Sequence, residues 1–90
     1  MKIKSNCLIF KSSPENFFKE RNGLKSNTVR RISLWSEMRD FEMFMEYYYK
    51  PQKPVMVIII NSVNGLEFTR RVTDITQFEG LWVISWKHEE

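Results

Sequence analysis

The run Val55-Met56-Val57-Ile58-Ile59-Ile60 is the feature that most constrains the fold of this chain of 90 residues. Consecutive apolar and mostly β-branched residues are typical of a strand that is buried on both faces or central in a sheet. The Asn64-Gly65 pair that follows suits the positive φ angles of a hairpin turn. We therefore expect an antiparallel return strand over residues 66–76.

Three further segments have extended character: residues 6–11, residues 28–32 and residues 81–86. Side chains alternate between the two faces of a strand, so Trp82, Ile84 and Trp86 are expected on one face. The last strand would follow a turn over residues 77–80 and close the sheet.

A first helix is expected over residues 14–22. Its start and stop signals are Ser13, Pro14, Glu15 and the Asn22-Gly23 pair. Ser13 can cap the helix, and Pro14 suits its first position because no N–H is needed there. Phe17 and Phe18 are expected to anchor this helix to the core.

A second helix is expected over residues 33–49, followed by a proline-containing loop over residues 50–54. Its apolar stripe consists of Leu34, Met38, Phe41, Met45 and Tyr48, which recur at steps of three and four residues. Further aromatic residues, Trp35, Phe44, Tyr47 and Tyr49, are candidates for binding a protein partner.

This order of elements predicts a single α+β domain over residues 1–90, built as a small mixed β-barrel or a curved sheet with two helices at its ends. Seven Phe, three Trp and three Tyr supply a dense core for so short a chain. No apolar stretch is long enough to span a bilayer and no signal peptide is visible, so we expect a cytoplasmic protein.

The sequence contains few residues that could bind a metal ion or act as a reactive thiol. Cys7 is the single cysteine and lies in an apolar run, and His88 is the single histidine and lies in a charged tail. We therefore expect no metal site and no cofactor. A net charge of +3 favours an anionic partner only weakly.

The segment from Gly23 to Arg31 holds the densest group of side chains that could bind a ligand. The residues expected to bind the ligand are Lys25, Asn27, Thr28 and Arg30. Arg70, from a later strand, is a further candidate for ligand binding. Strand alternation places Arg30 on the face of Thr28 and Arg31 on the other face. These donors could bind phosphates or the edges of nucleobases.

The run Phe17…Gly23-Leu24-Lys25-Ser26-Asn27-Thr28-Val29-Arg30 resembles the signature of ASCH domains of the PUA-like superfamily, and it is especially similar to short phage and prophage members. The segments Ile58–Asn61, Gly65–Phe68, Val72–Ile75 and Leu81–Trp86 are similar to their later strands. The helix over residues 33–49 departs from the family pattern, which has a loop or strand with a Gly-Asp pair there. The resemblance implies a PUA-like barrel that binds RNA, a nucleotide or a modified base.

One branch of that superfamily hydrolyses N4-acetylcytidine with a lysine, a threonine and a glutamate. The resemblance implies the first two roles for Lys25 and Thr28, and Glu79 is a candidate for the third only by its position in the last turn. Three hypotheses follow: binding of nucleic acid or a nucleotide through the Lys25–Arg30 turn, docking on a host protein through the aromatic helix, and amidohydrolase activity.

Overall fold

The computed structural model describes residues 1–32, 35–49 and 54–88, without the side chains of residues 35–37. The expected loop over residues 50–54, apart from Pro54, and Leu34 of the apolar stripe lie outside this description. The elements are β1 (Lys2–Lys4), β2 (Cys7–Ser12), α1 (Pro14–Arg21), β3 (Asn27–Arg30), α2 (Trp35–Tyr49), β4 (Met56–Asn61), β5 (Glu67–Phe78) and β6 (Leu81–Trp86).

The six strands form one mixed sheet in the order β1-β2-β4-β5-β6-β3. Strands β2 and β4 run parallel, and the other neighbours are antiparallel. The expected three-strand meander is confirmed as β4, β5 and β6. The edge strands β1 and β3 do not pair with each other, so the chain is an α+β fold with an open sheet and not a closed barrel.

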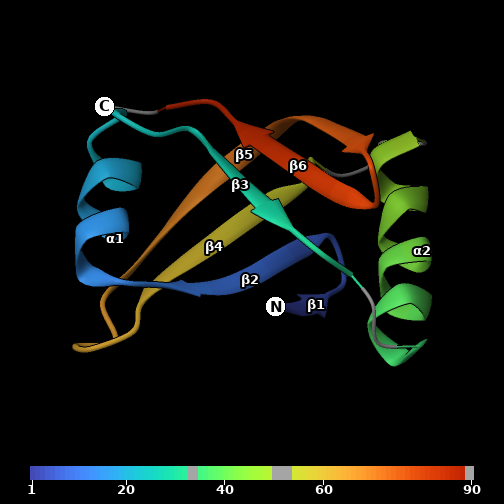
Figure 1. Ribbon diagram of the computed structural model, residues 1–90, viewed down its shortest axis with the longest axis horizontal. Helices are drawn as coiled ribbons and strands as arrows, with labels where there is room; N and C mark the ends of the chain where they lie inside the picture. Colours follow the sequence, from blue (N-terminus) through green and yellow to red (C-terminus); the bar gives the residue numbers. More distant parts are fainter. Residues whose placement is uncertain (33–34, 50–53, 89–90) are drawn as a thin grey trace.

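Strand β5 bends the sheet because it is shared between two sets of strands. Glu67 to Arg71 pair with β4, and the residues from Val72 onward pair with β6, with a register shift between Val72 and Asp74. An irregularity of this kind increases the local twist and bends the strand. Figure 1 shows the result, with α1 and α2 at opposite ends of the curved sheet and the strands crossing between them.

Helix α1 begins where the sequence predicts and ends at Arg21, one residue before the predicted end. The hydroxyl of Ser13 accepts a hydrogen bond from the backbone N–H of Asn16 at 3.4 Å, and Pro14 is the first helical residue. Gly23 follows the helix end with φ +80°. Phe17 is buried, but Phe18 is 62% exposed and does not anchor the helix. Adjacent helical residues point about 100° apart, so only one of the two can face the sheet.

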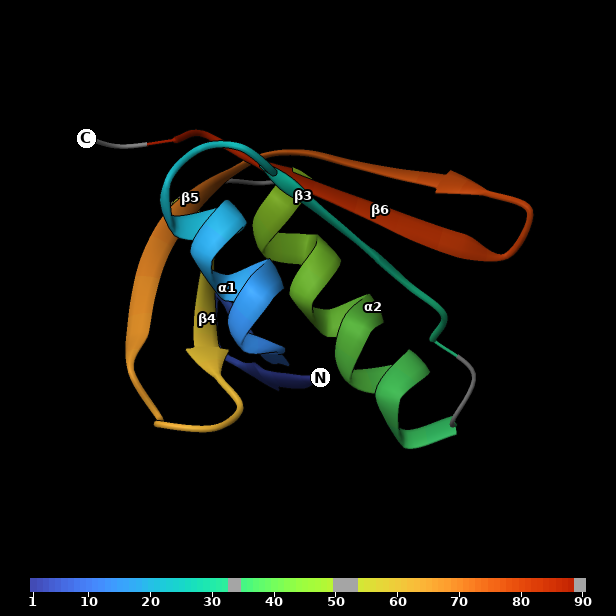
Figure 2. The ribbon, with the colours of Figure 1, turned by 60° about the vertical axis from the view of Figure 1, so that its left-hand side comes forward.

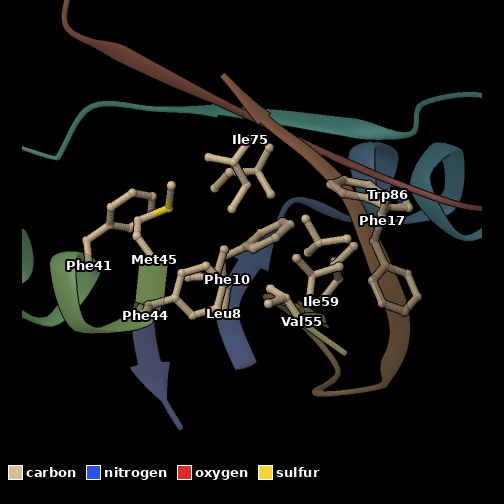
Figure 3. Packing of buried hydrophobic residues seen from close by; sticks show 13 residues of the cluster. Leu8, Phe10, Phe17, Phe41, Phe44, Met45, Val55, Ile59, Ile75 and Trp86 are labelled. Atoms are coloured by element: carbon tan, nitrogen blue, oxygen red, sulfur yellow. The ribbon is translucent and has the colours of Figure 1, made fainter. Parts of the chain in front are cut away.

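The core joins residues of both helices and of β2, β4, β5 and β6, and Figure 3 shows how they pack. Its buried members are Leu8, Phe10, Phe17, Phe41, Phe44, Met45, Val55, Val57, Ile59, Val72, Ile75, Ile84 and Trp86. Strand β4 buries every second residue, whereas the sequence also allowed burial on both faces. Neither described helix is long and apolar enough to cross a membrane.

Helix α2 presents a stripe that differs from the expected one. Phe41, Phe44 and Met45 are buried, whereas Met38 is 42% exposed. Phe44 is only 1% exposed, so its assignment to a partner-binding surface is wrong. The steps from Phe41 to Phe44 and Met45 are three and four residues, which places all three side chains on the same face of the helix.

The C-terminal segment packs on Gly23, which follows α1, although the sequence placed His88 in a charged tail. A Cβ atom on Gly23 would lie 2.9 Å from the His88 imidazole, whereas a Cβ on Gly65, which also has positive φ, would meet no atom within 4 Å. Close approach and backbone conformation therefore both require glycine at position 23.

We expect Gly65→Ala to lower the free energy of unfolding by about 1 kcal/mol from backbone strain alone, and Gly23→Ala to lower it by about 2 kcal/mol or more. Urea unfolding of the two variants measures the difference. In a His88→Ala background the two glycine substitutions should cost the same, because the ring that a new Cβ would meet is gone. A difference that persists in this background would show that His88 does not account for it.

Candidate functional site

A buried carboxylate lies on the inner face of α1. Glu20 follows Phe17 by three residues and therefore points to the same side of the helix. Its side chain is 1% exposed, and its Oε2 lies 3.5 Å from the Nζ of Lys25. The other oxygen, Oε1, is buried and has no hydrogen-bond partner among the described residues. A buried charge with an unpartnered oxygen costs stability, so this group needs an explanation.

The loop after α1 brings Lys25 back to Glu20. The backbone N–H groups of Leu24 and Lys25 both donate to the carbonyl of Lys19, at 2.9 and 3.1 Å. The loop is therefore folded onto the helix end, as is common where a glycine follows a helix. The Lys25 side chain is 34% exposed, so it lies between the buried carboxylate of Glu20 and the solvent.

Strand β3 carries Thr28 and Arg30, and the charge of Arg30 interacts with that of Glu20. The Nε–H of Arg30 donates to the hydroxyl of Thr28 at 3.1 Å, which places both side chains on one face of the strand, as alternation predicted. The Arg30 guanidinium lies over the Phe10 ring, 4.6 Å from its centroid. Stacking of this kind attracts a cation to the face of an aromatic ring.

Burial lowers the pKa of the Arg30 guanidinium from its ordinary value, and the negative charge of Glu20 opposes that shift. Arg30 nevertheless stays charged at any physiological pH. Glu20, Lys25, Thr28 and Arg30 are called the Glu20 cluster below. It joins one buried carboxylate, two cations and a buried hydroxyl from α1, the following loop and β3.

The structure gives the other two predicted ligand-binding residues different surroundings. Asn27 is exposed and occupies the opposite face of β3 from Thr28. Arg70 donates to the backbone carbonyl of Arg21 at 3.2 Å and lies 4.5 Å from the Phe68 ring centroid, so it holds the end of α1.

Glu79, the predicted catalytic carboxylate, lies in the turn between β5 and β6. It is exposed and has φ +49°. Glu20 takes the place beside Lys25 instead. The sequence contained a signal for this, because Glu20 shares the helical face of Phe17 and precedes Lys25 by one short loop. This signal is weak, because Glu20 lies between the charged residues Lys19 and Arg21.

The remaining candidates for partner binding lie on α2. Tyr47 is 36% exposed and Tyr49 is 71% exposed. The side chain of Trp35 lies outside the described part of the structure. Within the described residues, no three His, Cys, Asp or Glu side chains lie close enough together to hold a metal ion.

Comparison with known proteins does not assign this chain to a family. No protein-family model matches the chain, and no curated protein matches it. The resemblance to ASCH domains stays a prediction from the residues that carry it.

We expect Glu20→Gln to lower the free energy of unfolding by about 2 to 3 kcal/mol, because Lys25 and the partly buried Arg30 lose a nearby opposite charge. Glu15→Gln is the matched control on the same helix. Its ion pair with Lys19 measures 3.3 Å but is solvent-exposed, so its loss should cost at most about 0.5 kcal/mol. Equal costs in urea unfolding would show that the burial of Glu20 adds nothing.

Proposed function

We propose that the Glu20 cluster binds a nucleotide or a nucleobase within single-stranded nucleic acid. The observation that carries this proposal is the buried, unpartnered Oε1 of Glu20 beside the Lys25 ammonium group. A carboxylate oxygen accepts a hydrogen bond from an exocyclic amino group such as N4 of cytosine. A base with such a group would satisfy Oε1 and remove the cost of leaving it unpaired.

The neighbouring cations suit the rest of a nucleotide. Lys25 is partly exposed and would bind a phosphate oxygen as a point charge. Arg30 is held in place by its hydrogen bond to Thr28 and its contact with Phe10, so the orientation of its remaining N–H groups is fixed. A fixed guanidinium loses little conformational freedom on binding, which favours recognition of a defined base edge. This function agrees with the PUA-like resemblance.

We expect the protein to bind cytidine monophosphate and short cytosine-rich RNA at low salt, and binding to weaken as salt is raised. Lys25→Ala and Glu20→Gln should each weaken binding by about tenfold or more, equivalent to about 1.4 kcal/mol. Isothermal titration calorimetry on folded variants provides the measurement.

Arg31→Ala is the matched control for charge, because Arg31 is exposed and follows Arg30 directly. It should change affinity by less than about twofold. An effect of Arg31→Ala as large as that of Lys25→Ala would indicate general attraction of anions to a basic surface. Absence of binding by the parent protein would reject the proposal.

A second candidate function is hydrolysis of N4-acetylcytidine, favoured by the presence of a glutamate beside Lys25 in the Glu20 cluster. In this proposal the Thr28 hydroxyl attacks the acetyl carbonyl and its proton passes to Lys25, which must be neutral to accept it. Cytidine leaves after its N4 takes up the proton that Lys25 accepted, and water then hydrolyses the acetyl ester of Thr28, which releases acetate and restores the hydroxyl. Glu20 replaces Glu79 in this scheme as the carboxylate that assists the leaving amine.

We expect release of cytidine and acetate from N4-acetylcytidine, followed by chromatography. Thr28→Val and Glu20→Gln should reduce the rate by about a hundredfold or more, whereas Glu79→Gln should leave it unchanged. Turnover that depends on Glu79 and not on Glu20 would contradict this assignment. A parent protein that binds cytidine monophosphate without turnover would keep the binding function and remove the catalytic one.

A further inference from the structure

A second surface lies between α2 and β6, and its Trp82 is the cross-strand partner of Arg30 of the Glu20 cluster. A groove of about 340 Å³ is lined by Phe41, Met45 and Tyr49 from α2, by Trp82 from β6, and by two acidic residues of α2, Glu42 and Glu46. Figure 2 shows α2 running below β3 and β6. A volume of this size is at the lower end of the range for ligand pockets and accommodates one or two large side chains.

The floor of the groove is apolar and aromatic. Phe41 and Met45 are buried, and the Phe41 and Trp82 rings lie 4.7 Å apart between centroids at an angle of 51°. Tyr49 is 71% exposed and forms part of the wall. Aromatic rings arranged around an opening attract cations through the negative charge on their faces.

The wall that α2 contributes is acidic. Glu42 and Glu46 are four residues apart, so both lie on the same side of the helix, both are exposed, and neither pairs with a cation in the part of the chain that the structure describes. Like charges at this spacing destabilise a helix slightly, which a bound cation would reverse. Four acidic residues and one arginine give α2 a net charge of −3, although the whole chain carries +3.

We propose that this groove binds a basic segment of a partner protein, with an arginine or lysine side chain entering it. The methylene groups of that side chain would pack on Met45 and Phe41, since long basic side chains bury their stems on apolar surfaces. Its charged end would contact Glu42 and Glu46, and Trp82 and Tyr49 would add cation–π attraction. Nucleic acid has the wrong charge for this surface, so the two sites of the protein bind different partners.

The test uses the full chain and a fluorescent peptide of alternating leucine and arginine, blocked at both ends. Fluorescence anisotropy should show saturable binding, and the counterpart peptide with glutamate in place of arginine should not bind. The double variant Glu42→Gln/Glu46→Gln should weaken binding by about tenfold or more. Tyr49→Ala should weaken it by about threefold, since an exposed aromatic wall is removed.

The matched control is Asp40→Asn/Glu79→Gln, which removes two exposed charges that do not line the groove. It should change affinity by less than about twofold. Equal effects of the two double variants would overturn the proposal, because general attraction between opposite charges would then explain the binding. No saturable binding at peptide concentrations up to about 1 mM would overturn it as well.

One further outcome would identify a different occupant of the groove. If sedimentation shows a dimer that Glu42→Gln/Glu46→Gln dissociates, the groove is occupied by a second copy of this chain and the proposal is wrong.

A second outcome tests whether the two sites are independent. Lys25→Ala should leave peptide binding unchanged, which separates this site from the nucleotide site. Loss of peptide binding in that variant would contradict the independence of the two surfaces.

Discussion

The hydrogen-bond pairing of β5 with two different partners is the constraint on which the rest of the structure depends. One strand of 12 residues joins β4 to β6, and the register shift after Val72 turns its second half away from its first. The same strand holds both helices. Arg70 donates to the last residue of α1, and the Tyr48 hydroxyl of α2 donates to Asp74 and accepts from the backbone N–H of Ile75. The bend therefore fixes where each helix lies.

Both candidate sites follow from this arrangement. Helix α1 carries Glu20 inward at one end of the sheet, and β3 adds Thr28 and Arg30, of which Arg30 pairs with Trp82 of β6. Helix α2 lies at the other end, where its Phe41 meets Trp82 of β6. The first site has two cations around one carboxylate, and the second has two carboxylates around aromatic rings. The two sites adjoin where Arg30 pairs with Trp82, but their opposite charges suit two different partners, and this is the functional interpretation that we favour.

Glu20 illustrates why a site of this kind is difficult to find in sequence. A single glutamate among Lys19 and Arg21 has the appearance of a solvated helix surface, and most such residues are exposed. Its burial depends on the rotation of α1 about its own axis, which Phe17 sets by packing against Phe68 at 5.2 Å between ring centroids. Phe18 would have turned Glu20 toward solvent had it been the anchor, because the two phenylalanines point about 100° apart. Whether Glu20 is buried or exposed therefore depends on which of the two adjacent phenylalanines packs against the sheet.

The sequence by itself determined the described elements other than β1, and their order, because caps, prolines, glycines and apolar periodicity act over a few residues. The start of α1, the meander of β4, β5 and β6, and the shared face of Thr28 and Arg30 are all confirmed. Tertiary structure decided that the sheet stays open, that Phe44 is buried, and that Glu20 rather than Glu79 lies beside Lys25. These outcomes depend on the bend in β5 and on the rotation of each helix, which are set by packing between residues far apart in the chain.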